Sequence, residues 1–271
     1  MNYRNDEEEQ RVEGQLENGL ADLAAPAPDD FALRVLQRVG IPRERYDTYS
    51  HLDNTAGGLY VAYSSDAVTG SAVDIMVEGP DEFERLHHAR TGRTAIPTSA
   101  VFPGLRPALR TGRAKRLPID LSGLTELESA VLGAVRSIPS GQLRPITWLA
   151  REASVSSATG PILSALSKNP VPVLIPCHRV TYETGTPCDA AYTERVGRAL
   201  RSAEGIDMLR LEELSQRGAV FLGSDTTRIY CHPTCAHARR ITRPHQIPFR
   251  NARDARQAGY RACKSCRPTT V

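Results

Sequence analysis

Two pairs of closely spaced cysteines near the C-terminal end of the chain constrain its fold more than any other feature. Three residues separate the first pair, two separate the second, and 27 lie between the pairs. Four thiolates at this spacing suit a tetrahedral zinc ion, which tolerates a long intervening loop. Disulfides are the alternative, but a pair two residues apart closes a strained ring, and nothing in the sequence indicates an oxidising compartment. The sequence therefore predicts Zn2+ bound by Cys231, Cys235, Cys263 and Cys266.

The segment that carries these cysteines is strongly basic. Residues 218–271 hold ten lysines and arginines against two acids, a net charge of +8, whereas the whole chain of 271 residues carries +3. Such an excess of cationic side chains is typical of a surface that binds phosphate. A basic surface that only aids solubility is the alternative. The charge distribution favours DNA as a partner of this region and indicates no particular protein partner.

The first 30 residues differ sharply from this tail. They hold nine acids and two arginines, and they are expected to form an acidic disordered lead-in. An acidic start lacks the basic and apolar pattern of a secretory signal, and the chain has no run of 18 apolar residues. We therefore expect a cytoplasmic protein that has no membrane partner.

Residues 31–120 alternate between helical and strand patterns and predict an αβ block without obvious chemistry. Strands are expected over residues 59–63 and 73–77, separated by a polar turn that contains Gly70. Helices are expected over residues 31–39, 80–90 and 103–110.

From residue 124 the spacing of apolar residues predicts mainly helices. Helices are expected over residues 124–135, 146–153 and 196–203, and a further one opens at Pro161 with Thr159 as its N-cap. The helix over residues 146–153 and the helix that opens at Pro161 form either a helix-turn-helix or an ordinary packed pair. Residues 207–218 then separate this helical domain, 121–206, from the cysteine-rich domain, 219–271.

A single cysteine, Cys177, ends an apolar segment and is followed directly by His178 and Arg179. Cationic neighbours favour the thiolate, which is the nucleophilic form of cysteine. The alternative is a buried free cysteine that packs as a small hydrophobe. The residues alone leave both interpretations open.

Residues 169–180, NPVPVLIPCHRV, resemble the active-site segment of the O6-alkylguanine-DNA alkyltransferases. Residues 138–141 upstream, and Gly185 and Glu204 downstream, fall at that family's spacings. The resemblance implies an α/β protein in which a ribonuclease-H-like αβ block precedes a helical, winged-helix-like alkyltransferase domain. A small zinc-bound α+β domain would follow.

The resemblance also implies roles for four residues. Cys177 would accept an alkyl group from guanine O6 in one irreversible turnover, as in a methylated-DNA–protein-cysteine S-methyltransferase. His178 would act on Cys177 through a water as its base, and Glu204 would orient His178. Asn169 would support the active-site turn. Because a base must leave the duplex to reach a thiol, the helix-turn-helix interpretation is favoured.

The chain differs from the family at positions that contact DNA or line the alkyl pocket in that family. Gly160 stands in place of the arginine that fills the gap left by the flipped base. Ile146 and Ala190 replace tyrosines, and Leu163 and Cys188 replace glycines. The alternative to repair is therefore a non-catalytic alkyltransferase-like damage sensor or a DNA-binding zinc module.

The cysteine-rich region resembles the zinc domain of the bacterial Ada proteins. The likeness is carried by residues 221–235, 249–252 and 258–268. It implies that Cys231 takes a methyl group from a DNA methylphosphotriester, and a purely structural zinc site is the alternative. In Ada proteins the zinc domain comes first and a transcription-factor domain follows it. Here the order is reversed and residues 207–218 leave no room for an activator domain, so a self-contained transcriptional activator is disfavoured. The two resemblances together imply alkylated double-stranded DNA as the partner.

Overall fold

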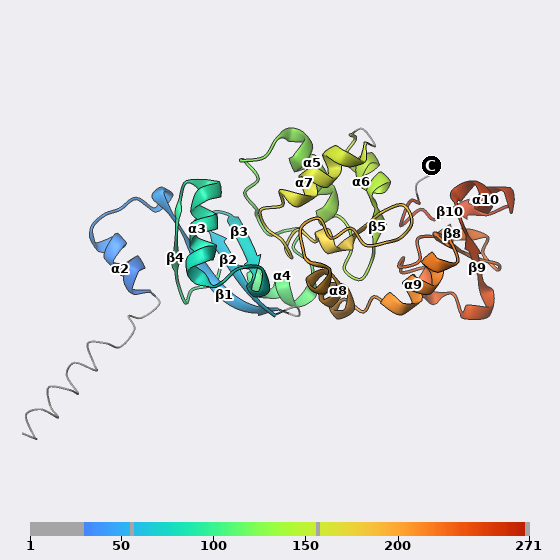
Figure 1. Cartoon of the computed structure of the whole chain (residues 1–271), viewed down its shortest axis with the longest axis horizontal. Helices are drawn as coiled ribbons and strands as arrows, with labels where there is room; N and C mark the ends of the chain where they lie inside the picture. The colour runs from blue at the N-terminus through green and yellow to red at the C-terminus, as the bar shows by residue number, and fades with distance from the viewer. Residues whose placement is uncertain (1–29, 55–56, 156–157, 269–271) are drawn as a thin grey trace, which may run out of the picture.

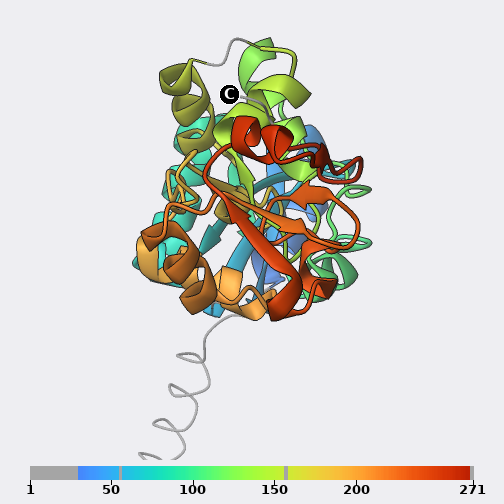
Figure 2. The ribbon, with the colours of Figure 1, turned by 90° about the vertical axis from the view of Figure 1, so that its right-hand side faces the viewer.

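The computed structural model describes residues 30–54, 57–155 and 158–268, and it is a mixed α/β structure. An N-terminal αβ block, a helical region and a C-terminal four-stranded sheet follow one another along the long axis of the molecule (Figure 1). Figure 2 looks onto the C-terminal sheet from that end. The predicted acidic lead-in lies outside the described residues, apart from Asp30. Among the described helices, none has the length and apolar character needed to cross a membrane.

The N-terminal block is built on a four-stranded sheet with the order β3-β2-β1-β4. All neighbours pair antiparallel except β1 and β4, which pair parallel. Its strands are β1 (Tyr46–Asn54), β2 (Gly57–Tyr63), β3 (Val68–Val73) and β4 (Thr94–Pro97). Its helices are α2 (Phe31–Arg38), α3 (Pro80–Thr91) and α4 (Leu105–Thr111), with 3-10 turns at Arg43–Arg45 and Asp74–Met76. Helix α3 covers one face of the sheet through Phe83, which packs against Tyr49 and Ala62.

The prediction that Gly70 lies in a turn is wrong. Gly70 is inside strand β3, and the expected strand over residues 73–77 is instead a 3-10 turn after β3 ends. A Cβ atom at Gly70 would lie 2.1 Å from Nη2 of Arg90 and 2.9 Å from Nδ1 of His87. The glycine therefore makes room for side chains of α3 instead of bending the chain. The actual turn lies between β2 and β3, where Ser64 N donates to Ala67 O at 2.9 Å.

The helical region continues the same hydrophobic core. Residues of the sheet such as Leu59 share one buried cluster with Leu132 and Ile162 of the helices. The helices are α5 (Glu126–Arg136), α6 (Ile146–Glu152), α7 (Thr159–Ser167) and α8 (Glu194–Ala203), and β5 (Arg144–Pro145) pairs parallel with β6 (Val180–Thr181). The ribonuclease-H-like and winged-helix-like folds stay predictions.

The predicted N-cap of α7 is also wrong. The helix begins at Thr159 itself, its N-cap is Ala158, and no side-chain cap bond is made there. Pro161 therefore occupies the third helical position. Because none of the first N–H groups of a helix has an intrahelical acceptor, proline is tolerated there as well as at the first position.

Helix α9 (Met208–Gln216) occupies the stretch that the sequence suggested was only a separator. The Asp207 side chain caps it by accepting from Arg210 N at 2.9 Å. Met208 packs with Leu143 of the helical region, and Leu214 packs with Leu222 of the C-terminal sheet. The connector is therefore an ordered helix that is packed on both sides.

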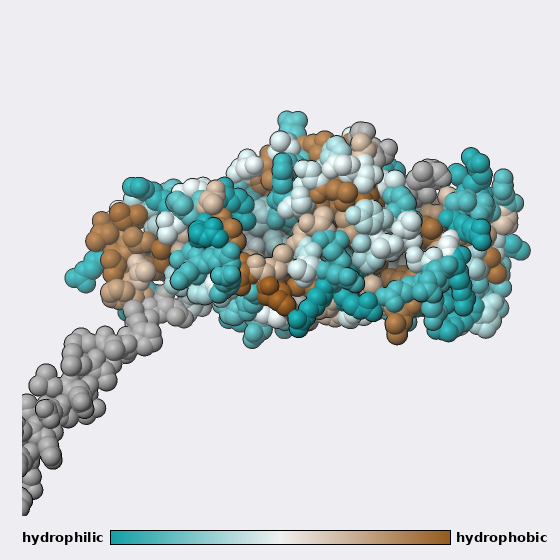
Figure 3. Space-filling model, viewed as in Figure 1, coloured by the Kyte–Doolittle hydropathy of each residue, from teal (hydrophilic) through white to brown (hydrophobic). Residues whose placement is uncertain are grey.

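The C-terminal sheet has the order β10-β8-β7-β9 and a small core of its own. Its elements are β7 (Phe221–Ser224), β8 (Ile229–Cys231), β9 (Gln246–Phe249), α10 (Ala252–Gln257) and β10 (Arg261–Ala262), with 3-10 turns at Ala238–Arg240 and Arg243–His245. Aromatic side chains fill the core, where the rings of Phe249 and Tyr260 meet edge to face at 4.9 Å. Figure 3 shows this end of the molecule as mostly hydrophilic, in contrast to the apolar patch over α2 at the other end.

Candidate functional site

Cys177 lies at the start of a short 3-10 turn, Cys177–Arg179, after a tightly held loop. The Asn169 amide donates to Ile175 O at 3.0 Å and to Cys177 Sγ at 3.1 Å, while its oxygen accepts from Val171 N at 3.0 Å. Strand β3 holds the other side of the loop, because Ser71 Oγ donates to Pro172 O at 2.7 Å. One amide side chain thus fixes both ends of the loop and contacts the sulfur.

The Cys177 thiol is 1% exposed and is held in its protonated form. Burial raises its pKa to about 12, the hydrogen bond from Asn169 acts in the opposite direction, and the nearby Cys188 thiol adds to the rise. A protonated thiol is a poor nucleophile. A nucleophilic role for Cys177 would therefore require a base that removes the proton.

His178 follows Cys177 in the chain, and its orientation is fixed by Glu204. His178 Nε2 lies 2.9 Å from Glu204 Oε1. Burial lowers the pKa of His178, so the ring is neutral near pH 7 and donates its Nε2 proton to the carboxylate. The other ring nitrogen, Nδ1, is then an acceptor, and it has no hydrogen-bond partner among the described residues. This arrangement leaves Nδ1 ready to receive a proton.

Glu204 stays ionised because other donors surround it. Burial alone would raise its pKa, but hydrogen bonds from His178 and Arg179 outweigh that effect and lower it to about 2. Arg179 Nε lies 3.0 Å from both carboxylate oxygens, and Gly141 N donates to Oε2 at 2.8 Å. Arg179 also donates to the carbonyl of Ile138 at 2.7 Å. The carboxylate is therefore a fixed negative charge behind His178.

Two further residues belong to this site, and the sequence pattern did not reveal them. The ring of Tyr192 lies 5.9 Å from that of His178, and its hydroxyl accepts from Val173 N at 2.7 Å. Val173 has a φ of 73°, an unfavourable value for a branched residue, and this hydrogen bond helps to hold it. The buried Arg201 donates to Asp189 at 2.7 Å and to the carbonyl of His178 at 3.3 Å. Only the position of Tyr192, two residues after Ala190, could have pointed to an aromatic neighbour.

The helices expected to contact DNA lie beside this site. Gly160 is exposed in the first turn of α7, with open space where a Cβ would be. Ile146 is 2% exposed at the start of α6, and Leu163 is half-buried against the core. The hydrophobic replacements therefore stabilise packing, whereas position 160, at the exposed end of α7, has no side chain.

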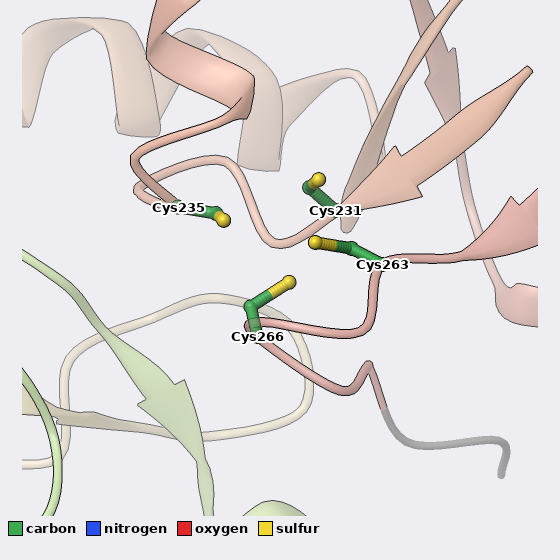
Figure 4. A group of neighbouring side chains, drawn as sticks. All are labelled: Cys231, Cys235, Cys263 and Cys266. Carbon is green, nitrogen blue, oxygen red and sulfur yellow. The ribbon is translucent and has the colours of Figure 1, made fainter. Parts of the chain in front are cut away.

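The four cysteines of the C-terminal domain meet in one cluster (Figure 4). All four are buried and their Sγ atoms lie within 4.8 Å of one another. Zinc–sulfur bonds of about 2.3 Å require sulfur–sulfur distances of about 3.8 Å in a tetrahedron, so a small contraction closes the site. The ligands come from the end of strand β8, from the loop after it and from the segment after β10.

The pKa shifts of Cys231 and Cys235 also indicate that the cluster binds a cation. Hydrogen bonds with Cys235 and Cys266 raise the pKa of Cys231, whereas hydrogen bonds from Cys231 and Cys266 lower the pKa of Cys235. One thiolate thus forms readily and opposes the ionisation of the others. A divalent cation is needed to keep all four sulfurs as thiolates at once, and this donor set suits Zn2+.

One side of the cluster opens into a basic pocket of about 480 Å³. Cys231 and Cys263 line it, together with the cationic side chains of Arg240, Arg261 and Lys264. The pocket therefore combines two of the sulfurs with groups that attract phosphate.

Two family models match the chain over adjacent ranges. Residues 126–206 match the model described as "6-O-methylguanine DNA methyltransferase, DNA binding domain". Residues 209–269 match the "Metal binding domain of Ada". The two matches meet inside the connecting region, where helix α9 lies.

Curated relatives include two proteins named methylated-DNA–protein-cysteine methyltransferase. The one from Methanothermobacter thermautotrophicus is 36% identical over 92 residues, 33% of this chain and 50% of that protein. The one from Shigella flexneri is 32% identical over 107 residues, 37% of this chain and 61% of that protein. The bifunctional transcriptional activator/DNA repair enzyme Ada of Escherichia coli is 36% identical over 70 residues, 26% of this chain and 20% of its own length. The chain thus spans between a fifth and three fifths of these three relatives.

A solved structure of Mycobacterium tuberculosis OGT in complex with DNA also resembles the chain. It has a TM-score of 0.44 and 24% sequence identity, and the match covers 58% of this chain and 92% of that one.

Proposed function

Since the chain joins an alkyltransferase-type DNA-binding domain to an Ada-type zinc-binding domain, we propose that it repairs DNA by transferring alkyl groups to its own Cys177 and Cys231. Each cysteine would act once, so the protein is consumed by the reaction. The proposed partner is alkylated double-stranded DNA, which would place a bacterial protein of this kind at the nucleoid.

The observation that carries the proposal is the buried Cys177 thiol beside a neutral His178 whose Nε2 is hydrogen-bonded to Glu204. Through one water, His178 Nδ1 would take the thiol proton as Sγ attacks the alkyl carbon attached to guanine O6. The S–C bond forms, the C–O bond breaks, and the proton passes to the departing guanine. Glu204 remains ionised and stabilises the transient imidazolium. Arg179 supports this role because it keeps the carboxylate from taking up the proton itself.

The second acceptor, Cys231, faces the basic pocket. When bound, zinc holds the four cysteines as electron-rich thiolates. Cys231 Sγ would attack the methyl carbon of a phosphotriester, so that an S–C bond forms, the C–O bond breaks and a phosphodiester anion leaves. Arg240, Arg261 and Lys264 would attract the DNA backbone and balance the new negative charge.

Intact-protein mass spectrometry tests both transfers. The chain is incubated with duplex DNA that carries either O6-methylguanine or a methylphosphotriester, and each substrate should add one methylene group (CH2) to the protein mass. Cys177→Ala should abolish only the increment from O6-methylguanine. Cys188→Ala is the matched control, because Cys188 is also buried and free but is not a proposed acceptor. No mass gain with either substrate would overturn the proposal.

A second candidate function is a sensor that binds alkylated DNA without transfer. Gly160 favours it, because this position of the first turn of α7 offers no side chain to replace a flipped base. The same experiment separates the two functions. A sensor would retard alkylated duplexes in a gel while its own mass stays constant.

A further inference from the structure

The C-terminal metal-binding domain is attached to the helical region through the loops that carry two of its cysteines. Trp148 Nε1 donates to the carbonyl of Cys266 at 3.1 Å. Thr234, the residue before Cys235, accepts from Leu143 N through its hydroxyl at 2.7 Å. The backbone around these two ligands is therefore positioned by side-chain and backbone groups of the helical region.

Arg144 is buried at this interface. It is 2% exposed, and its guanidinium donates to Leu143 O at 2.7 Å and to Gln142 Oε1 at 2.6 Å. It also lies over the Trp148 ring, 5.6 Å from the centroid. Within the described residues its Nε has no hydrogen-bond partner, and no carboxylate pairs with it. A buried cation without a counter-ion is strongly destabilising, so its charge requires a partner.

The cysteine cluster can supply the negative charge that the Arg144 guanidinium needs. Burial lowers the pKa of Arg144, and the sulfurs of Cys266 and Cys235 raise it, ahead of those of Cys263 and Cys231. A zinc ion with four thiolates carries a net charge of about −2. Arg144 therefore lies on the side of the cluster formed by Cys266 and Cys235, and the basic pocket lies on the side of Cys231 and Cys263.

We propose that Arg144 is the counter-ion of the zinc–thiolate centre, so that the alkyltransferase-type domain completes the metal site of the zinc domain. The proposal rests on zinc binding but not on methyl transfer. The guanidinium stabilises negative charge on Cys266 and Cys235. Cys231 and Cys263 face the cationic side chains of the pocket instead, on the other side of the cluster.

The affinity of the full chain for zinc, measured by competition with a metal chelator, tests this role. Arg144→Met keeps the length and apolar contacts of the side chain but removes the charge, and it should raise the Kd for zinc at least tenfold, or about 1.4 kcal/mol. Arg144→Lys keeps the charge and should stay within about threefold of wild type. Arg151→Met is the matched control, because Arg151 donates to Arg267 O at the same interface but is exposed.

Cobalt substitution gives a second readout that a purely structural residue would not affect. The thiolate-to-cobalt charge-transfer band should move to lower energy in Arg144→Met, because the sulfur electrons lose the nearby positive charge, and it should not move in Arg151→Met. Equal zinc Kd values for Arg144→Met and Arg151→Met, with unmoved cobalt bands, would overturn the counter-ion role. A wild-type chain that binds no zinc would instead overturn the metal site itself, whatever the outcome of the transfer assays.

Discussion

Cys177 and Cys231 are both 1% exposed, yet their sulfur atoms have opposite surroundings. Cys177 is a single thiol with a pKa of about 12, next to a neutral imidazole and an amide donor. Cys231 belongs to four sulfurs that need a cation to ionise together and that face cationic side chains on two sides.

Under the proposed function, the difference corresponds to two ways of making a buried sulfur reactive. At Cys177 the charge appears only when a base removes the proton, so the site depends on His178 and Glu204. At Cys231 the charge is permanent once the metal is bound, so the site depends on zinc. The two acceptors should therefore respond to different perturbations, and four experiments test this separation.

Removal of zinc should have the largest effect. Metal binding contributes on the order of 10 kcal/mol to small four-cysteine domains, so chelation should unfold the C-terminal sheet. Transfer to Cys231 should disappear, whereas transfer to Cys177 persists. Limited proteolysis and peptide mass mapping check both outcomes. A C-terminal domain that resists protease after chelation would show that its aromatic core is sufficient for folding.

The rate at which iodoacetamide labels Cys177 should show the second-largest effect. A shift in the pKa of Cys177 from 9.0 to about 12 predicts labelling about 1,000-fold slower than that of a free cysteine at pH 8. The rate should rise about tenfold per pH unit, because thiolate is limiting. Peptide mapping of the native and guanidinium-unfolded chains measures it. Labelling of native Cys177 at the rate of the unfolded chain would contradict the protonated resting state.

Glu204→Gln should break one site and spare the other. The folded pKa of Glu204 lies below its ordinary value, so its contribution to stability is present above pH 4.5 and is lost as the pH falls to about 2. The shift corresponds to about 3 kcal/mol at pH 7, which the variant should lose. Transfer to Cys177 should slow while transfer to Cys231 is unchanged.

Denaturant unfolding at pH 7 and pH 3 measures that loss. Glu183→Gln is the control, because Glu183 is an exposed carboxylate that accepts from Thr147. If the two variants lose the same free energy at pH 7, the buried network around Glu204 is not the source of the stabilisation.

Gly160→Arg should have the smallest effect. An arginine in the first turn of α7 has open space and could fill the gap left by a flipped base, which recovers part of an unstacking cost of a few kcal/mol. Transfer from duplex DNA to Cys177 should accelerate roughly tenfold, while transfer from a single strand should not change. Equal acceleration on both substrates would mean that another group already fills the gap.

The parts of the molecule that could be predicted from sequence are those encoded over short distances along the chain. The segment around Cys177 and the two cysteine pairs each place their functional atoms within a few residues, and the predicted helices α3, α5 and α8 were confirmed with shifts of one or two residues at their ends. Those features depend on local spacing, which periodicity and motif analysis detect.

The parts that could not be predicted depend on contacts between distant residues. The sequence predicts a turn at Gly70, because nothing local indicates that Arg90 passes over it. Trp148 and Cys266 are 118 residues apart, and no pattern near Arg144 indicates that its charge faces the sulfurs. The interface between the domains is therefore a property of the folded chain only.

Helix α9 has a consequence for how the protein would search DNA. A nine-residue helix is about 14 Å long, and this one is packed against both domains instead of serving as a loose tether. A flexible tether would let the second domain sample many positions around the first, at millimolar effective concentration. A rigid connector does not allow the second domain to sample those positions. A duplex held at Cys177 would thus present only one fixed stretch of backbone to Cys231, and lesions elsewhere would require release and a new encounter.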